Sequence, residues 1–370
     1  MLAQYYYDVY LFFILIITLF CYNRYFAIDG EVREDGSLGF YLPQKETLAF
    51  ILMLFMVLFI GTRPISGRFF GDMSSYYMEY KIYEGKDFSF DASLPDFLWT
   101  NLMHWWASLR LGFNSLMVLV ACLYFGGTYK AVCRIFPNDK LAAYLIFLGA
   151  FSTFSYGTNG MRAGVAASVF LLALSYAGNW IVTIPLAFVT LYIHHSMVMP
   201  IFAMFAALAY RKTNVYLGIW LVCVFISALH ITWFQDIFSQ LSAGSGDKSG
   251  AEYLEVSNSG GWRTGFRLDF ILYSAMPVVV SYYTVLKKKI YSEYYSFLVN
   301  IYLITNSMWL LCMYANFTNR IAYLSWFMYP VVLIYPFLND DWGQNRYRIF
   351  AIIMLLNLGF TLAMQYIYYL

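Results

Sequence analysis

Long runs of hydrophobic residues, separated by short polar connections, dominate the sequence. Leu11–Phe20, Leu48–Ile60 and Leu217–Leu229 are three of these runs. A helix needs roughly 20 mostly apolar residues to cross a bilayer, and only helices and closed barrels satisfy their backbone hydrogen bonds in hydrocarbon. The sequence lacks the short alternating stretches that are typical of barrel strands. The pattern therefore predicts an all-α fold, a polytopic bundle of transmembrane helices.

The hydrophobic runs divide into about twelve predicted spans. They are Tyr5–Phe26, Thr47–Thr62, Ser115–Ile135, Leu141–Tyr156, Ala163–Ala177, Trp180–Ile193, Ser196–Tyr210, Val215–Ile231, Leu268–Leu286, Tyr295–Tyr314, Ile321–Leu338 and Ile349–Tyr368. Merging the fifth span with the sixth, or the sixth with the seventh, would change the count and invert part of the topology. Met1–Phe26 has no basic region and no small-residue cleavage site, so we expect it to be a retained first span. The whole chain, residues 1–370, is predicted to be a single integral membrane domain.

Basic residues are concentrated in alternate connections between the predicted spans. They are Lys130, Arg134, Lys140, Arg211, Lys212, Lys287, Lys288, Lys289, Arg346 and Arg348. Connections rich in lysine and arginine usually face the cytoplasm. The intervening connections, at residues 159–162, 194–195 and 315–320, hold one arginine, none and one. The pattern therefore places both termini on the non-cytoplasmic side.

Two longer loops are predicted on that same outer side. Residues 63–114 are rich in charged groups, and residues 232–267 are rich in glycine and serine, which predicts a flexible flap. Within the first loop, Asp96–Phe113 is predicted to be an amphipathic helix at the membrane interface. Ser93 and Asp96 match a helix-start signal. The residues expected to face the membrane are Trp99, Trp105 and Trp106.

Composition narrows the class of protein further. Only 12% of the residues are charged and 61% are hydrophobic, whereas soluble domains are about a quarter charged. A net charge of +2 gives no reason to expect a nucleic-acid partner. The five cysteines are scattered without ligand spacing, and phosphate-binding, zinc-protease and serine-hydrolase motifs are missing. We therefore expect no cofactor and no metal, and a substrate that arrives in the membrane already activated.

Five arginines from distant parts of the chain are predicted to lie at the outer membrane face. They are Arg63, Arg162, Arg263, Arg267 and Arg320. An arginine in hydrocarbon costs roughly 2.5–3.5 kcal/mol on insertion scales, so such residues usually face a polar cavity. Because planar guanidinium groups bind phosphate oxygens in pairs, we expect this cluster to bind a substrate diphosphate. Ordinary interfacial anchoring by snorkelling is the alternative.

Candidate catalytic groups lie on the same face. His195 is suited to act as a base at neutral pH, and Asp72 is a second candidate base or a partner for an arginine; the alternative for Asp72 is a solvated loop carboxylate. Adjacent histidines point to different faces of a helix, so His194 and His195 do not form a metal site by themselves. The candidate glycan contacts are Tyr76, Asn159 and Trp262. For the aromatic residues, an interfacial belt is the alternative.

Four motifs, which occur along the chain in the family's order, resemble those of the EpsG-like bacterial polysaccharide polymerases. Residues 159–166, Asn-Gly-Met-Arg-Ala-Gly-Val-Ala, resemble the family's N-x-x-R-x-G-x-A helix start, and residues 194–196 resemble its H-x-S turn. Residues 63–76 are similar to its first-loop pattern R…G-x-D-x-x-x-Y, and Arg320–Tyr323 to its late R-x-x-Y. The resemblance covers the chain from about residue 60 to residue 330.

The resemblance implies a Wzy-type (O-antigen) polymerase, a metal-independent glycosyltransferase. Such an enzyme joins undecaprenyl-diphosphate-linked oligosaccharide repeat units at the periplasmic or exterior face of the bacterial plasma (inner) membrane, as in lipopolysaccharide biosynthesis. A chain-length regulator protein is a further expected partner. The sequence departs from the R-x10-G motif of many O-antigen polymerases, since Ala173 follows Arg162 at that spacing and Ser274 follows Arg263. The alternatives are a flippase for lipid-linked oligosaccharides, and an O-antigen ligase or other lipid-sugar glycosyltransferase.

Overall fold

A computed structural model of the chain describes residues 2–27, 45–237 and 265–369. Within these ranges the secondary structure is helical throughout, without a β-strand, which confirms the predicted all-α class. Each of the about twelve predicted spans coincides with a helix or a helix pair among the described residues. The helices occur where apolar runs are longest, because a helix is the only open structure that pairs all of its own backbone groups in lipid.

Five of these helices are long and apolar enough to cross a membrane. They are Ala3–Phe26, Phe113–Ile135, Leu268–Lys287, Thr318–Asn339 and Arg346–Ile367. A bent pair, Lys140–Leu148 with Phe151–Thr158, would be a sixth span. The shorter apolar helices are Thr47–Gly61, Met161–Leu174, Trp180–Ile193, His195–Ala209 and Thr213–Ala228. The described chain is thus that of a multi-pass membrane protein, and the total of about twelve crossings stays a prediction.

The chain divides into two compact units. Unit 1 comprises Met1–Met197 and Ile334–Leu370, and unit 2 comprises Val198–Leu333. The described helices that lie wholly in unit 1 are α1 (Tyr6–Ala27), α2 (Lys45–Gly61), α3 (Gly67–Phe70), α4 (Met73–Tyr83), α5 (Phe97–Ser108), α6 (Phe113–Ala121), α7 (Gly127–Ile135), α8 (Lys140–Leu148), α9 (Phe151–Thr158), α10 (Met161–Leu174), α11 (Trp180–Ile193) and α20 (Arg346–Tyr369). Those in unit 2 are α12 (Val198–Ala209), α13 (Thr213–Ala228), α16 (Leu268–Tyr282), α17 (Glu293–Leu311) and α18 (Thr318–Trp326), and α19 (Tyr329–Asn339) crosses the boundary.

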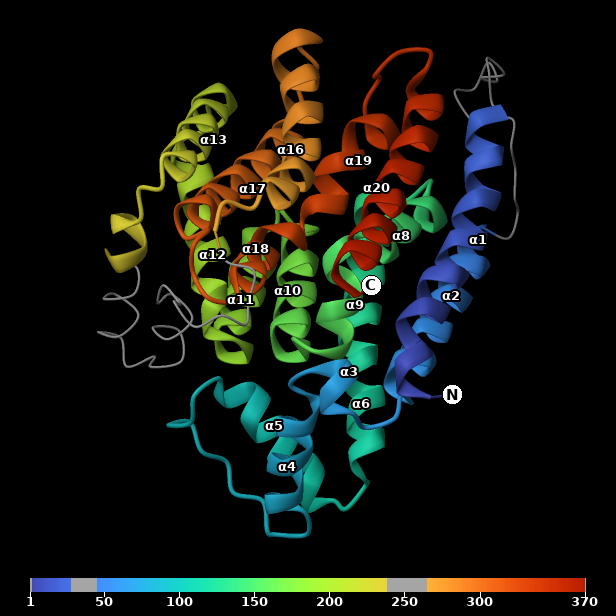
Figure 1. Ribbon diagram of the computed structural model, residues 1–370, viewed down its shortest axis with the longest axis vertical. Coiled ribbons are helices and arrows are strands. Elements are labelled where there is room, and N and C mark those ends of the chain that lie inside the picture. Colours follow the sequence, from blue (N-terminus) through green and yellow to red (C-terminus); the bar gives the residue numbers. More distant parts are fainter. Residues whose placement is uncertain (1, 28–44, 238–264, 370) are drawn as a thin grey trace. The chain divides into compact units, whose positions relative to one another are not determined.

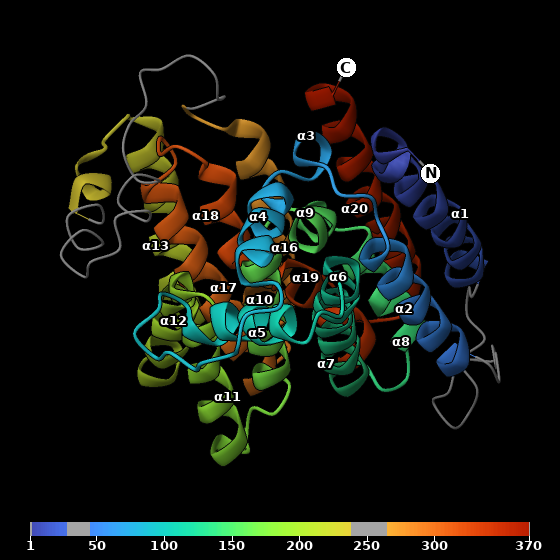
Figure 2. The same cartoon turned by 90° about the horizontal axis from the view of Figure 1, so that it is seen from below.

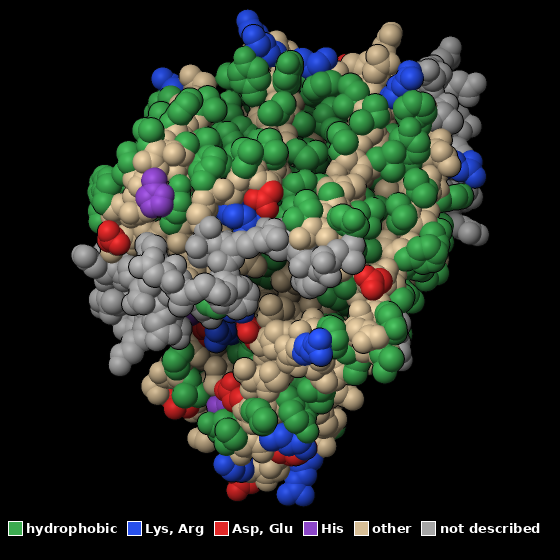
Figure 3. Space-filling model, in the orientation of Figure 1, with side chains coloured by type: hydrophobic (Ala, Val, Ile, Leu, Met, Phe, Trp, Pro, Cys, Tyr) green, Lys and Arg blue, Asp and Glu red, His purple; other side chains and the backbone are tan. Residues whose placement is uncertain are grey.

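In unit 1, α1 packs along α20, and its aromatic side chains contact those of α2 (Figures 1 and 2). Aromatic contacts fix the direction of the first pair: Tyr6 meets Phe59, with ring centroids 4.9 Å apart, near the start of α1 and the end of α2. Tyr25 meets Phe350 at 5.0 Å, near the end of α1 and the start of α20. The exposed side chains of α1 and α2 are largely hydrophobic (Figure 3). An apolar outer surface on antiparallel helices is what a lipid environment requires.

A sharp break separates α8 from α9. The two helices meet at an angle of 73°, although the sequence predicts one continuous span. The backbone carbonyls at the break receive hydrogen bonds from Tyr10, Thr153, Asn357 and Thr361, at 2.5–3.0 Å. A broken helix is tolerated in a membrane only when the freed backbone groups find such partners. The break directs α9 toward the end of unit 1 at which α10 begins.

The two ends of unit 1 differ in charge. The end of α7 receives a hydrogen bond from Asn339 at the Ile135 carbonyl (2.9 Å). Tyr25 donates to Asp139 before α8 (2.6 Å) and contacts Tyr347 at the start of α20. This basic end carries Arg134, Lys140, Arg346 and Arg348. The opposite end holds the end of α2, the first outer loop, and the turn between α9 and α10. Within unit 1 the connections that hold these basic residues thus lie at the same end, and their position in the cytoplasm stays a prediction.

The first outer loop forms a helical cap at that opposite end. In it, α4 and α5 pack together, and charged side chains gather at the tip next to α4 (Figures 1 and 3). The predicted amphipathic helix is present but ends at Ser108 rather than Phe113. The predicted start signal is wrong, because the Ser93 hydroxyl bonds Asp91 (2.6 Å) rather than the helix. Trp99 is buried instead of facing the membrane, whereas Trp105 is exposed.

Unit 2 is organised around α17, and a buried polar network links its helices. Asn306 of α17 donates to Ser274 of α16 (3.2 Å) and Ser325 of α18 (2.9 Å) and accepts from Trp220 of α13 (2.7 Å). Such interhelical hydrogen bonds stabilise helix packing in lipid by about 0.6 kcal/mol each on average. In this unit, too, the basic residues at 211–212 and 287–289 lie at one end, and the starts of α16 and α18 lie at the other.

Candidate functional site

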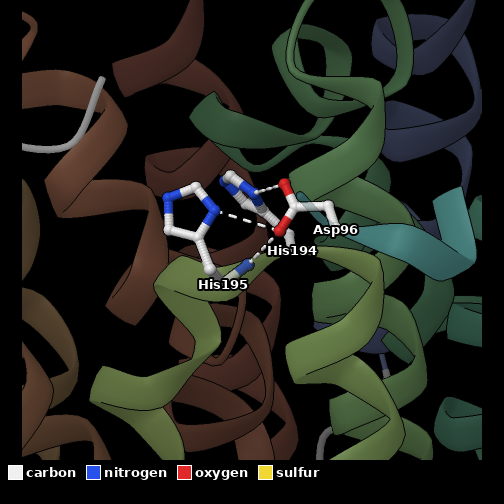
Figure 4. Close-up of side chains that lie close together, drawn as sticks. All are labelled: Asp96, His194 and His195. Atoms are coloured by element: carbon white, nitrogen blue, oxygen red, sulfur yellow. Dashed lines mark hydrogen bonds and ion pairs between the residues drawn. The ribbon is translucent and has the colours of Figure 1, made fainter. Parts of the chain in front are cut away.

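Asp96 is the centre of a polar cluster at the non-basic end of unit 1. Its side chain is only 1% exposed and contacts three other residues: His194 and His195, which Figure 4 shows, and Arg162. The Oδ1 atom accepts hydrogen bonds from the backbone N–H (2.8 Å) and Nδ1 (3.0 Å) of His195. The Oδ2 atom contacts Nδ1 of His194 at 3.2 Å and Nη1 of Arg162 at 2.9 Å. Each carboxylate oxygen therefore serves two donors.

Four elements bring these residues together. Asp96 immediately precedes α5, Arg162 lies in the first turn of α10, His194 follows the last residue of α11, and His195 begins a short 3₁₀ segment. Close packing of α9 on α10 depends on Gly164, because a Cβ atom there would lie 2.7 Å from the Tyr156 carbonyl oxygen. The site is thus assembled from segments that are far apart in sequence but share one end of unit 1.

The backbone of Asp96 explains why its side chain reaches the histidines. Its φ and ψ of 49° and 47° are left-handed, a conformation that aspartate and asparagine adopt more readily than most residues. An aspartate just before a helix normally caps the first N–H groups, but this one makes no capping hydrogen bond. Its carboxylate is instead committed to the donors of α10, His194 and His195.

Burial and hydrogen bonding set the charges within the cluster. Burial by itself raises the pKa of Asp96, but hydrogen bonds from His194 and His195 and the charge of Arg162 outweigh it, so the pKa lies well below its usual range. Burial, assisted by Arg162, lowers the pKa of His194 to about 4. At neutral pH Asp96 is therefore an anion and His194 is neutral.

Three residues of the cluster have side chains that could in principle bind a metal ion. The ligand atoms of Asp96, His194 and His195 lie within 4.8 Å of one another, and this residue combination is found in zinc and iron sites. However, both Nδ1 atoms already face the carboxylate, whose four acceptor positions are occupied, and the guanidinium of Arg162 lies on Oδ2. A cation would have to displace these donors and lie beside a positive charge, so the geometry favours a hydrogen-bonded network.

Arg63 lies beneath the turn that carries Arg162. It is 1% exposed, and its guanidinium donates to the carbonyls of Ile60 (2.7 Å) and Thr158 (3.0 Å) and contacts the sulfur of Met161 (2.9 Å). Among the described residues it has no carboxylate partner, and its Nε atom is buried without an acceptor. Because the Arg63 side chain is enclosed by protein, a ligand would not contact it directly. The positive charge of Arg63 nevertheless lies under the start of α10.

The other predicted residues of unit 1 lie beside the cluster. The backbone N–H of Asp72 donates to Oδ1 of Asn159 (2.9 Å), which ties the first outer loop to the α9–α10 turn. Gly71 makes this possible, since its φ is +53° and a Cβ atom would lie 2.3 Å from the same oxygen. Tyr76 packs edge-on against Trp99, with centroids 5.4 Å apart. Their roles in binding a glycan stay predictions.

The remaining predicted arginines do not belong to unit 1. Arg267, at the start of α16, pairs with Asp269 through contacts of 2.9 and 2.6 Å and stacks on Phe270. Arg320 lies in the first turn of α18, with its guanidinium 5.1 Å from the Phe317 ring. The structure places both at the non-basic end of unit 2, and their meeting with Arg162 stays a prediction. Arg263 and Trp262 lie outside the described residues.

Two members of the cluster, Asp96 and His194, were not among the predicted site residues. Asp96 matched a helix-start signal in a loop with several other carboxylates. Its functional surroundings come from residues 66, 98 and 99 positions away, which a local pattern does not reveal. One sequence feature could have indicated His194: the short polar turn at 194–195 between two apolar helices. In the structure both histidines of this turn, and not only His195, contact Asp96.

The fold and this cluster define a class, a multi-pass helical membrane protein with an Arg–Asp–His site at one end of a helical unit. The family comparison is more specific. The model of the EpsG family matches residues 46–369, and the chain belongs to the EpsG family. This membership suggests a membrane protein of the polysaccharide-polymerase type. No curated protein and no solved structure matches the chain.

Proposed function

We propose that this protein is a polysaccharide polymerase that joins undecaprenyl-diphosphate-linked oligosaccharide repeat units at the outer face of the bacterial plasma membrane. Membership of the EpsG family supports the class. The observation that carries the proposal is the juxtaposition of Arg162 and His195 on one buried carboxylate. A glycosyl transfer needs a cation for the departing diphosphate and a base for the acceptor hydroxyl.

Positive charge at the start of α10 supports the binding of a diphosphate. The first turn of a helix presents N–H groups and the positive end of its dipole. The buried guanidinium of Arg63 lies below this turn, and its charge is not neutralised by a carboxylate in the described chain. Arg162 is 32% exposed, and Asp96 engages only Nη1 of its guanidinium within the described part of the protein. Nη2 is therefore available for a phosphate oxygen.

His195 is the proposed base. Its side chain is 43% exposed, and its Nδ1 atom faces Asp96. We therefore propose that Nε2, the ring nitrogen on the other side of the imidazole, meets the acceptor. In the proposed step, Nε2 takes the proton of the acceptor hydroxyl as its oxygen bonds to the anomeric carbon of the donor. The bond from that carbon to the diphosphate oxygen breaks, and the electron pair departs on the diphosphate, where Arg162 stabilises the charge.

The distribution of charge favours an enzyme over a flippase. A flippase would need charged groups at mid-span depth that both faces can reach. In unit 1, Arg63, Arg162 and Asp96 lie at the end opposite the basic one, and in unit 2 Arg267 and Arg320 lie at the starts of their helices. Both distributions suit a site at one membrane face.

Substitution of Arg162 by alanine tests the proposal. In the host bacterium we expect long-chain polysaccharide to disappear while the variant accumulates in the membrane at a normal level. Arg134→Ala is the matched control, because Arg134 is an exposed arginine at the basic end of unit 1, and its chain-length pattern should be unchanged. A normal polymer ladder from Arg162→Ala would refute the proposal.

A further inference from the structure

The carboxylate of Asp96 contacts both the proposed base and the proposed diphosphate ligand. Oδ1 holds His195 through two hydrogen bonds, and Oδ2 contacts Arg162 at 2.9 Å. The side chain is 1% exposed, so a substrate does not touch it. Any effect of Asp96 on the reaction must therefore pass through its partners.

We propose that Asp96 is a positioning residue, which fixes the proton of His195 on Nδ1 and holds Arg162 next to that base. This inference rests on the proposed function and adds to it a residue that sequence analysis did not assign. Because an ionised carboxylate only accepts hydrogen bonds, the Nδ1 atom that faces it must carry the proton. Nε2 then has a lone pair and is able to accept the proton of an acceptor hydroxyl.

The geometry also explains why a carboxylate is required at this position. Asp96 receives two donors on each oxygen, which uses the four acceptor positions of an ionised carboxyl group. An asparagine has only one acceptor oxygen. If the asparagine NH₂ group replaced Oδ1, it would face the donors of His195. If it replaced Oδ2, it would face those of Arg162 and His194, and in both cases two donors would meet. Asparagine would nevertheless suit the backbone, since it tolerates the left-handed conformation as well as aspartate does.

A common anchor has a further consequence for the chemistry. The acceptor oxygen and the departing diphosphate meet the same anomeric carbon during transfer, so the base and the cation must be held at a fixed separation on the two sides of that carbon. One carboxylate that binds both sets this separation without relying on flexible side chains. Correct placement of catalytic groups accounts for a large part of enzymatic rate enhancement.

Chemical modification of His195 tests the proposal without depending on activity. Diethyl pyrocarbonate reacts with neutral imidazole, and the extent of reaction at His195 in the purified full-length protein can be measured by mass spectrometry across a pH series. The described charged or titratable groups near His195 include Asp96 and His194, which contact it, Arg162, which contacts Asp96, and Tyr192, three residues earlier in the chain. Loss of the anion in Asp96→Asn should move the midpoint of modification to lower pH by about one unit.

A second variant makes the test robust against misfolding. Arg162→Gln removes the cation instead of the anion, and we expect the midpoint to move in the opposite direction, to higher pH. Asp91→Asn is the control, since Asp91 lies in the same loop, is exposed and contacts Ser93 rather than the histidines. Failure to fold does not produce opposite shifts in two variants. Unchanged midpoints in both variants would overturn the proposal.

An activity measurement separates this proposal from the proposed function. With lipid-linked repeat units in vesicles, Asp96→Asn should lower kcat by about 10²- to 10⁴-fold, by analogy with carboxylates that orient a catalytic histidine, and should change KM little. The double variant with His195→Ala should be no slower than His195→Ala alone. A wild-type protein that makes no polymer would refute the proposed function, whereas an active wild type with additive losses would refute only the role of Asp96.

Discussion

Burial determines the protonation of the side chains around Asp96. His194 is mostly enclosed, and this burial, with the nearby charge of Arg162, lowers the pKa of its imidazole to about 4. The carboxylate of Asp96 stays ionised because three neighbours donate to it or carry positive charge. Two histidines next to each other in sequence therefore differ in their surroundings: His194 is the more enclosed, and in the proposed reaction the more exposed His195 faces the acceptor.

This arrangement predicts an acid-sensitive structure. Above pH 6.5 His194 is neutral whether the chain is folded or unfolded. Between pH 6.5 and 4 the unfolded chain binds a proton that the folded protein does not, so the free energy of unfolding falls as the pH falls. The lowered pKa of Asp96 acts in the same direction below its usual value of 3.8. The His194 contribution is of the order of 3 kcal/mol.

The variant His194→Asn tests this pH dependence of stability. Asparagine can donate from the position of Nδ1 but does not titrate, so the variant should lose less thermal stability than the wild type between pH 7 and pH 4.5 in detergent. Unfolding midpoints of both proteins, each at the two pH values, give the comparison. Identical pH dependence in the two proteins would show that His194 does not carry this effect.

At the scale of the helices, the hydrophobic pattern is sufficient for most of the fold but not for its irregular parts. Helix positions follow apolar runs because lipid enforces helices, so Trp180–Ile193 is predicted to the residue. The α8–α9 break was not predicted, since donors from α1 and α20 stabilise it. The hydrophobic pattern and short motifs predicted His195 and Arg162 as site residues. They did not predict Asp96, because its position in the site depends on contacts with residues far away in the sequence.

Gly164 offers a test of how helix packing supports the site. In Gly164→Ala the new Cβ atom would lie 2.7 Å from the Tyr156 carbonyl oxygen, which as backbone yields only if α9 and α10 separate. We expect a loss of about 1–3 kcal/mol in stability, as for other overpacked positions, together with weaker polymer formation, because Arg162 lies in the same helix.

Gly359→Ala is the matched control for this change. Gly359 lies within α20 of the same unit, and a Cβ atom there meets nothing within 4 Å. Its unfolding midpoint should stay the same or rise slightly, since alanine favours a helix by roughly 0.5–1 kcal/mol over glycine. Equal midpoints for the two variants would contradict the packing argument.

At the scale of the whole molecule, the proposed polymerase requires a defined orientation in the membrane. Within each unit the basic connections lie at one end and the candidate site residues at the other, and the positive-inside rule assigns the basic end to the cytoplasm. The outer-face site follows from this assignment. It suits the proposed reaction because a lipid-linked donor presented at the exterior needs no nucleotide.

Cysteine substitution in intact cells tests the orientation. Lys86, in the first outer loop, and Lys130, near the basic end of unit 1, are both exposed. A membrane-impermeant thiol reagent should label Lys86→Cys strongly and Lys130→Cys only after the cells are opened, with the parent chain as the background control. The reverse pattern would place the Asp96 cluster on the cytoplasmic side and exclude an exterior polymerase.

The most direct test of the central claim is the reaction itself. Purified wild-type protein and Arg162→Ala should be reconstituted separately into lipid vesicles with an undecaprenyl-diphosphate-linked repeat unit, and the products should be separated by size. We expect a ladder of lengthening glycans with the wild type and unreacted repeat unit with Arg162→Ala. A wild-type protein that only moves the repeat unit across the bilayer, or a variant that polymerises at the normal rate, would refute the proposed polymerase activity.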